Sequence, residues 1–410
     1  MNLHALTTAP LQTWLTLLVG TLFFAFPTML GLANLAMLLL LVTGLFLLRQ
    51  AEVRAALLHT PVAWVLAGLY ALVLLGVLYT PADSNWVGLH LSKYAKLLYA
   101  AMIIALLTGK GNLQKVALNA FVAAMLVTLG STWLNVWFLL PWSESQNLGW
   151  GQSHHVFGDY ITQNVMMTFF CSLALHKAVQ TEKTKYRLMW AAVVLAAAVS
   201  VTHLSQGRTG YLLLFTSLMT YALVTTKGRW LAVSVALLVT LEALLLTTSG
   251  QLQSRVSEGI EEAQASSINN ESSIGHRLYN YKTTPKLIAE APLFGHGTGA
   301  YHVEICRILD RPEQCEVFGW HPHNQFLFLA ADHGLLGAAL YLALIVGMLV
   351  TALRSKDKTA RALLAVLAAV MLVDSMINSP LWSARESHFF MYMLALLVAM
   401  CHTANKEGQA

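Results

Sequence analysis

The chain has 410 residues, of which 57% are hydrophobic and 11% are charged, and its formal net charge is +5. This small number of charged side chains cannot cover the surface of a water-soluble globule of this size. The composition therefore excludes an ordinary soluble protein and predicts a polytopic membrane protein. The positive charge gathers in short connections between apolar runs, where it reports membrane orientation, and nucleic-acid binding is not expected.

Apolar runs long enough to cross about 30 Å of hydrocarbon recur along the chain. Backbone polar groups in lipid must be satisfied within the segment, so these runs are predicted to be helices. The pattern predicts an all-α integral membrane protein with about twelve transmembrane helices. They are expected at about residues 11–26, 28–48, 62–80, 91–108, 115–139, 160–176, 188–203, 210–226, 230–247, 334–353, 362–378 and 388–403.

Lys and Arg residues lie in every second connection between these runs. The positive-inside rule therefore predicts an inner-membrane protein with both termini in the cytoplasm. The first apolar run has no basic segment before it and continues into a second run, so no cleavable signal peptide is expected. Three regions follow from this topology: spans 1–9 in residues 1–247, an outside loop region in 248–322, and a re-entry helix with spans 10–12 in 323–410.

Two lysines lie at the outer end of the fourth predicted span, where the orientation rule leaves few cations. Lys93 and Lys96 are three residues apart and are expected on one helical face. Their side chains could extend to lipid head groups, or they could contact an anionic lipid substrate.

Arg208 lies in the tight outside turn Ser205–Gly210, between the seventh and eighth predicted spans. A permanent cation at the membrane edge is costly unless it faces water or an anion, which makes this arginine a functional candidate. The guanidinium fork can bind two phosphate oxygens at once.

The outside loop region is long enough to be functional or to form a small domain. A polar helix is expected over 251–264, followed by a second helical pattern over 274–291 that is broken at Pro285 and carries Arg277 and Tyr281. Cys306 and Cys315 are predicted to pair if the compartment is oxidising, with two free thiols as the alternative.

The stretch His321–Gly337, HPHNQFLFLAADHGLLG, is predicted to carry the chemistry where the loop re-enters the membrane. His323 can accept a proton, His321 offers a second imidazole two residues away, and Asn324 is a supporting residue. Asp374 is a lone carboxylate within the eleventh predicted span, where it could orient a histidine. The outside segments contain no paired-acid motif suited to Mg²⁺, so a metal-independent reaction is expected.

These motifs resemble those of the O-antigen ligase and polymerase superfamily of membrane glycosyltransferases. The resemblance lies in the His323-Asn324 pair followed by Gly334 and Gly337, in the Ser-x-Gly-Arg-Thr setting of Arg208, and in the Arg277 helix that leads into Pro-Leu-Phe-Gly.

The resemblance implies a GT-C-like fold and an O-antigen ligase that acts at the periplasmic face of a bacterial inner membrane. Such an enzyme moves polysaccharide from undecaprenyl diphosphate to a sugar hydroxyl of lipid A-core. By resemblance, His323 is the general base, Arg208 and Arg277 bind the diphosphate, and the anomeric centre is inverted. No cofactor is expected.

Other functions stay open at this point. An O-antigen polymerase or a protein O-oligosaccharyltransferase of the same superfamily would use a similar donor. A twelve-span secondary transporter fits the span count, although the halves show no internal repeat. A noncatalytic flippase or assembly partner would not need His323.

Overall fold

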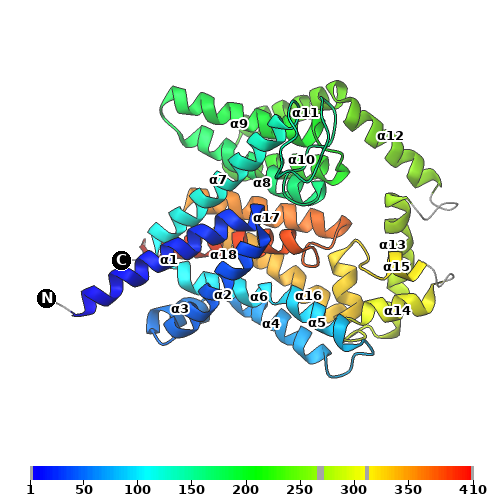
Figure 1. Cartoon of the computed structure of the whole chain (residues 1–410), viewed down its shortest axis with the longest axis horizontal. Helices are drawn as coiled ribbons and strands as arrows, with labels where there is room; N and C mark the ends of the chain where they lie inside the picture. Colours follow the sequence, from blue (N-terminus) through cyan, green and yellow to red (C-terminus); the bar gives the residue numbers. More distant parts are fainter. Residues whose placement is uncertain (1–2, 266–271, 310–313, 408–410) are drawn as a thin grey trace.

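The computed structural model describes residues 3–265, 272–309 and 314–407, and all regular structure within these ranges is helical (Figure 1). The N-terminal part contains α1 (Leu3–Thr28), α2 (Leu30–Leu47), α3 (Ala51–Leu58), α4 (Pro61–Gly76), α5 (Ser84–Tyr94), α6 (Lys96–Leu107) and α7 (Gly111–Leu134). The central part contains α8 (Tyr160–Gln180), α9 (Thr184–His203), α10 (Arg208–Thr225) and α11 (Arg229–Thr248). The remaining helices are α12 (Gly250–Ala265), α13 (Ser273–Glu290), α14 (Ala300–Ile308), α15 (Cys315–Phe318), α16 (Gln325–Arg354), α17 (Lys358–Ile377) and α18 (Ala384–Glu407).

The predicted class, an all-helical membrane protein, is confirmed. Within the described residues, eight helices are long and apolar enough to cross a membrane, and α3 with α4, bent by 76°, would make a ninth. Each of the twelve predicted spans falls on a helix, but α8, α10 and α11 are not among the eight, so the number twelve stays a prediction. In α8 the inward-facing residues include several polar ones, because this helix packs inside the bundle; they are Thr162, Gln163, Asn164, Thr168, Ser172 and His176.

The helix α18 forms the centre of the bundle. Every residue from Phe389 to Ala399 is fully buried, as expected for a helix that is apolar all round. It packs against α6, α17 and α7, and α17 in turn packs on α10 and α16. The position of the last residues of α17 is therefore fixed by the core.

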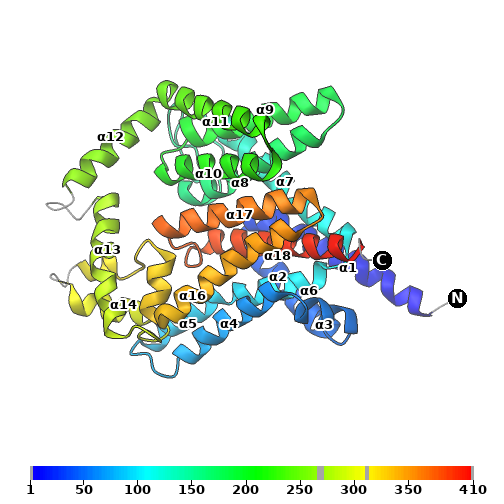
Figure 2. The same cartoon turned by 180° about the vertical axis from the view of Figure 1, so that it is seen from behind.

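The segment between α11 and α16 lies at one end of this bundle. Figures 1 and 2 show α12, α13, α14 and α15 on the side of the molecule opposite the two chain termini. The expectation that Pro285 breaks the second loop helix is wrong, since α13 continues through it. Proline has no N–H, so the carbonyl four residues before Pro285 loses its helical donor. Because Pro285 is exposed, water can donate to that carbonyl instead.

A break in α16 explains one glycine of the motif. Gly334 has φ +68° and ψ −172°, which interrupts the helix and leaves neighbouring backbone groups without helical partners. The turn before α14 replaces those partners: Leu335 N donates to Pro292 O at 2.8 Å, and His296 N donates to Ala331 O at 3.0 Å. A β-carbon at Gly334 would lie 2.2 Å from the backbone of Leu293, so the two segments can meet only at a glycine.

The same turn is held from its other side by buried polar groups. The Asp332 carboxylate accepts a hydrogen bond from Tyr301 N at 2.8 Å and lies 3.2 Å from His90 Nε2. Thr298 N donates to Gly76 O at 3.1 Å. These contacts therefore join α4, α5 and α14 to α16 near its break at Gly334. The break follows the His321–Asn324 segment in the chain.

We predict that Gly334→Ala destabilises the folded protein, because it combines left-handed backbone strain of about 1–3 kcal/mol with a direct clash. The thermal midpoint of the detergent-solubilised protein should fall. Gly68→Ala is the matched control, since a β-carbon there meets nothing within 4 Å. Equal midpoints for the two variants would contradict the role assigned to Gly334.

Candidate active site

The C-terminal end of α17 gathers side chains from two distant segments. Arg277 Nε donates to Ile377 O at 3.0 Å, and Asn324 Nδ2 donates to Met376 O at 3.1 Å. The Tyr281 hydroxyl also donates to Met376 O. The last carbonyls of a helix have no intrahelical donor and carry the negative end of its dipole, so they are suited to bind these donors.

The two histidines of the motif lie beside each other in a strained turn. Their ring centroids are 4.2 Å apart, and His323 N donates to His321 Nδ1 at 3.2 Å. Within the described residues, His323 is the one non-glycine residue with positive φ, at +53°. The next residue, Asn324, caps α16 by accepting a hydrogen bond from Leu327 N at 3.0 Å. The cap fixes where the strained turn ends and α16 begins, so it restrains the backbone next to His323.

The surroundings keep both imidazoles neutral. Burial lowers the pKa of His323 far below its usual range, and the positive charge of Arg277 lowers it further. Burial, Arg277 and Lys93 lower the pKa of His321 to about 4. A neutral imidazole can accept a proton, and a bound anion would raise its pKa by favouring the charged form.

Arg208 is the first residue of α10 and follows a turn that packs on α8. The Asn164 side chain donates to Ser205 Oγ at 2.8 Å, and a β-carbon at Gly207 or Gly210 would lie within 2.6 Å of the Asn164 amide. The turn is therefore held rigidly, with the arginine pointing to α12. Burial lowers the pKa of Arg277, and the positive charge of Arg208 lowers it further, so the two guanidinium groups are electrostatic neighbours.

Glu262 of α12 forms two hydrogen bonds to Arg208, each 3.1 Å long, and both side chains are 23% exposed. The same carboxylate accepts a hydrogen bond from Ile274 N at 3.1 Å, at the first turn of α13. The pairing of Glu262 with Arg208 could not be predicted from the sequence, because the two residues are distant in the chain and meet only through tertiary packing. A carboxylate thus occupies the guanidinium fork that the sequence predicted for phosphate.

The remaining predicted residues take different positions. Lys93 lies over the Trp382 ring, with Nζ 5.2 Å from the ring centroid, and its charge reaches His321. Lys96 is buried, and its ammonium donates to Ser92 O at 3.1 Å. Asp374 is fully buried in α17, and within the described residues its carboxylate bonds neither His321 nor His323.

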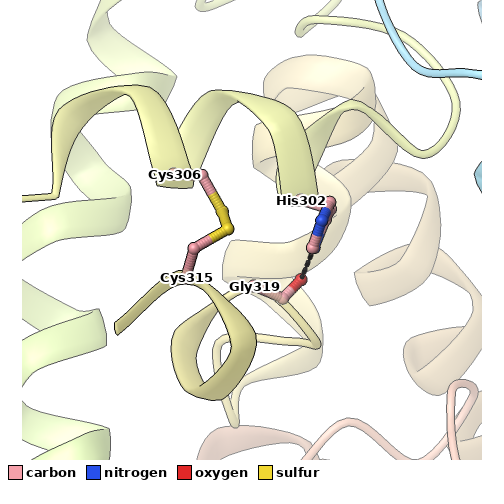
Figure 3. The surroundings of a disulfide bond; sticks show 4 residues. All are labelled: His302, Cys306, Cys315 and Gly319. Carbon is pink, nitrogen blue, oxygen red and sulfur yellow. Dashed lines mark hydrogen bonds between the residues drawn. A yellow bond between two sulfur atoms is a disulfide. The ribbon is translucent and has the colours of Figure 1, made fainter. Parts of the chain in front are cut away.

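Cys306 and Cys315 form a disulfide that joins α14 to α15 (Figure 3). Beside it, His302 Nδ1 lies 3.2 Å from Gly319 O, two residues before His321. The ligand atoms of His302, Cys306 and Cys315 lie within 4.8 Å of one another. The two sulfurs bond each other and are not thiolates, so this group fits a brace for the histidine segment better than a metal site.

Comparisons with known proteins bear on this arrangement. Residues 190–342, which include both arginines and both histidines, match the family model described as O-antigen ligase. This match over residues 190–342 supports membership of the O-antigen ligase superfamily. The match supports glycosyltransferase-type activity. No curated protein sequence matches the chain.

One similar solved structure is described as "Structural coordination of polymerization and crosslinking by a peptidoglycan synthase complex". The chain is 14% identical to it, with a TM-score of 0.46, and the alignment covers 84% of this chain and 97% of the other.

The Arg208–Glu262 pair yields a binding prediction. Two guanidinium groups are suited to bind a diphosphate, but Glu262 competes for one of them. Glu262→Gln removes the competing charge and keeps an oxygen that can accept from Ile274 N. We expect inorganic pyrophosphate to bind about threefold to tenfold more tightly by calorimetry, because a partly exposed ion pair is worth about 1 kcal/mol.

Glu261→Gln is the matched control, since Glu261 is exposed on the same helix. If the two variants bind pyrophosphate equally, Glu262 does not compete with the anion for Arg208.

Proposed function

We propose that this chain is an O-antigen ligase that transfers polysaccharide from undecaprenyl diphosphate to a sugar hydroxyl of lipid A-core. The observation that carries the proposal is the meeting of Arg277 and the histidine turn at the end of α17, with Arg208 as electrostatic neighbour. All of these residues fall within the segment that matches the O-antigen ligase family.

Arg208 and Arg277 bind the diphosphate of the donor. Two positive charges stabilise the negative charge that develops on the leaving diphosphate, and fixed donors do so without reorganisation during the reaction. Binding requires Arg208 to exchange Glu262 for phosphate oxygens, because the carboxylate holds both ends of the guanidinium fork. The cations of the chain itself fill the role that a divalent metal would have, so transfer is metal-independent.

His323 is the general base. The acceptor hydroxyl oxygen attacks the anomeric carbon, its proton passes to the neutral imidazole, and the bond from that carbon to the diphosphate oxygen breaks. The diphosphate leaves with the bonding electron pair on the side opposite the attack, so the anomeric centre is inverted. His321 is the less suitable base, because its Nδ1 already accepts the hydrogen bond from His323 N.

The site lies at the periplasmic face of the bacterial inner membrane in this proposal, and both termini lie in the cytoplasm. This orientation rests on the basic connections, which the positive-inside rule assigns to the cytoplasm. The end of the bundle that carries α12–α15 is opposite the chain termini, in agreement with that assignment (Figure 2).

We predict that His323→Ala lowers transfer from purified undecaprenyl-diphosphate-linked glycan to lipid A-core by about 10²–10⁴-fold, the usual effect of losing a general base. His321→Ala should cause a smaller loss, because it removes only the hydrogen bond that orients the turn. Both variants must show the thermal midpoint of the unaltered protein. An equal loss in both would contradict the assignment of the base.

The product of the same assay tests the acceptor. A ligase yields glycan-bearing lipid A-core, whereas a polymerase of this superfamily would yield longer chains that stay on the donor lipid. Formation of only the longer chains by the unaltered protein would exclude the ligase.

The low histidine pKa values also predict a pH profile. The base is active when neutral, so kcat/KM should stay constant as the pH falls through about 6.5, the ordinary histidine value, and decline only at lower pH. The bound diphosphate raises the pKa, so the decline in kcat should occur at higher pH than the decline in kcat/KM. A kcat/KM midpoint near about 6.5 would contradict the neutral, buried imidazole.

A further inference from the structure

A cleft of about 560 Å³ lies between α8, α10, α11 and α17, away from the candidate active site. Arg208 begins α10 and Ile377 ends α17 at the site, whereas the cleft is lined by the other ends of the same two helices. With 18 residues in α10, the two ends are about 27 Å apart. The cleft is therefore separate from the proposed chemistry.

One wall of the cleft is apolar and open to the surroundings of the bundle. Leu218 of α10 and Leu237, Leu238 and Leu241 of α11 line it. The Leu237 side chain is 65% exposed, so this wall opens sideways toward the region that lipid chains would occupy. The volume falls in the range of sites that bind small molecules.

The other lining residues include three cations and no carboxylate. Lys227 follows α10, and Lys358 and Arg361 lie in the first turn of α17. Within the described part of the chain, none of the three forms an ion pair with an acid. The nearby Asp357 is occupied in capping α17, where it accepts hydrogen bonds from Thr359 N and Ala360 N. Arg361 also donates hydrogen bonds to Ser355 O through Nε and Nη2. Even with the charge of Asp357 counted, three cations against one carboxylate leave this region with a net positive charge.

We propose that this cleft binds an anionic glycerophospholipid. Its phosphate contacts Lys227, Lys358 and Arg361, and one acyl chain lies along the leucine wall. Cations near a membrane surface attract anionic lipid head groups, and an apolar wall beside them stabilises a chain that free phosphate does not have. The combination of the two surfaces in one cleft selects the lipid over the soluble anion.

The test is native mass spectrometry of the full-length protein in detergent, with phosphatidylglycerol, phosphatidylcholine or inorganic phosphate added. We expect phosphatidylglycerol to be retained most strongly. The double variant Lys227→Ala/Lys358→Ala should weaken its retention more than tenfold, at about fivefold for each cation, which corresponds to about 1 kcal/mol. Leu238→Trp, which fills the apolar part, should weaken it as well.

Lys183→Ala/Lys185→Ala is the matched control, because it removes two exposed cations at the start of α9 without touching the cleft. Thermal midpoints establish that each variant is folded. Equal retention of phosphatidylcholine, equal losses in the two double variants, or phosphate binding as tight as phosphatidylglycerol would each overturn the proposal.

Discussion

The open carbonyl groups at the end of α17 connect the catalytic proposal to the rest of the fold. They accept hydrogen bonds from Arg277 in the loop region and from Asn324 at the start of α16. Since α17 packs on α18, whose residues 389–399 are fully buried, these carbonyls cannot move without disturbing the core. The bundle thus sets the separation between an arginine and a histidine turn that are far apart in sequence.

The charges around this helix end determine how the resting site behaves. Two neighbouring guanidinium groups repel each other and would be unstable together without an anion. Glu262 supplies a negative charge for Arg208, and the partial negative charge of the carbonyls at the end of α17 stabilises Arg277. Burial, helped by the positive charge of Arg277, keeps His323 neutral, so the unliganded site is ready to accept a proton. A bound diphosphate would displace the Glu262 carboxylate from Arg208, and its negative charge would also raise the pKa of His323.

The sequence predicted the helical membrane class because apolar runs of this length have few alternatives. The stretch around His323 could be singled out because its residues lie close together in sequence, and the catalytic roles within it stay predictions. The structure adds the reason for its glycine, since Gly334 breaks α16 where Leu293 approaches. It could not predict the Arg208–Glu262 pair, which depends on how α12 returns to α10. The break expected at Pro285 did not occur, because an exposed proline can be accommodated in a surface helix. Local sequence patterns predicted where helices form, but they could not predict which charged side chains pair in the folded protein.

The most direct test of the account is an experimental structure of the protein with undecaprenyl diphosphate bound. We expect diphosphate oxygens in contact with both Arg208 and Arg277, Glu262 displaced from Arg208, and the His323 imidazole facing the side of the site where the acceptor hydroxyl would enter. A diphosphate bound elsewhere, with the Arg208–Glu262 pair still formed, would contradict it.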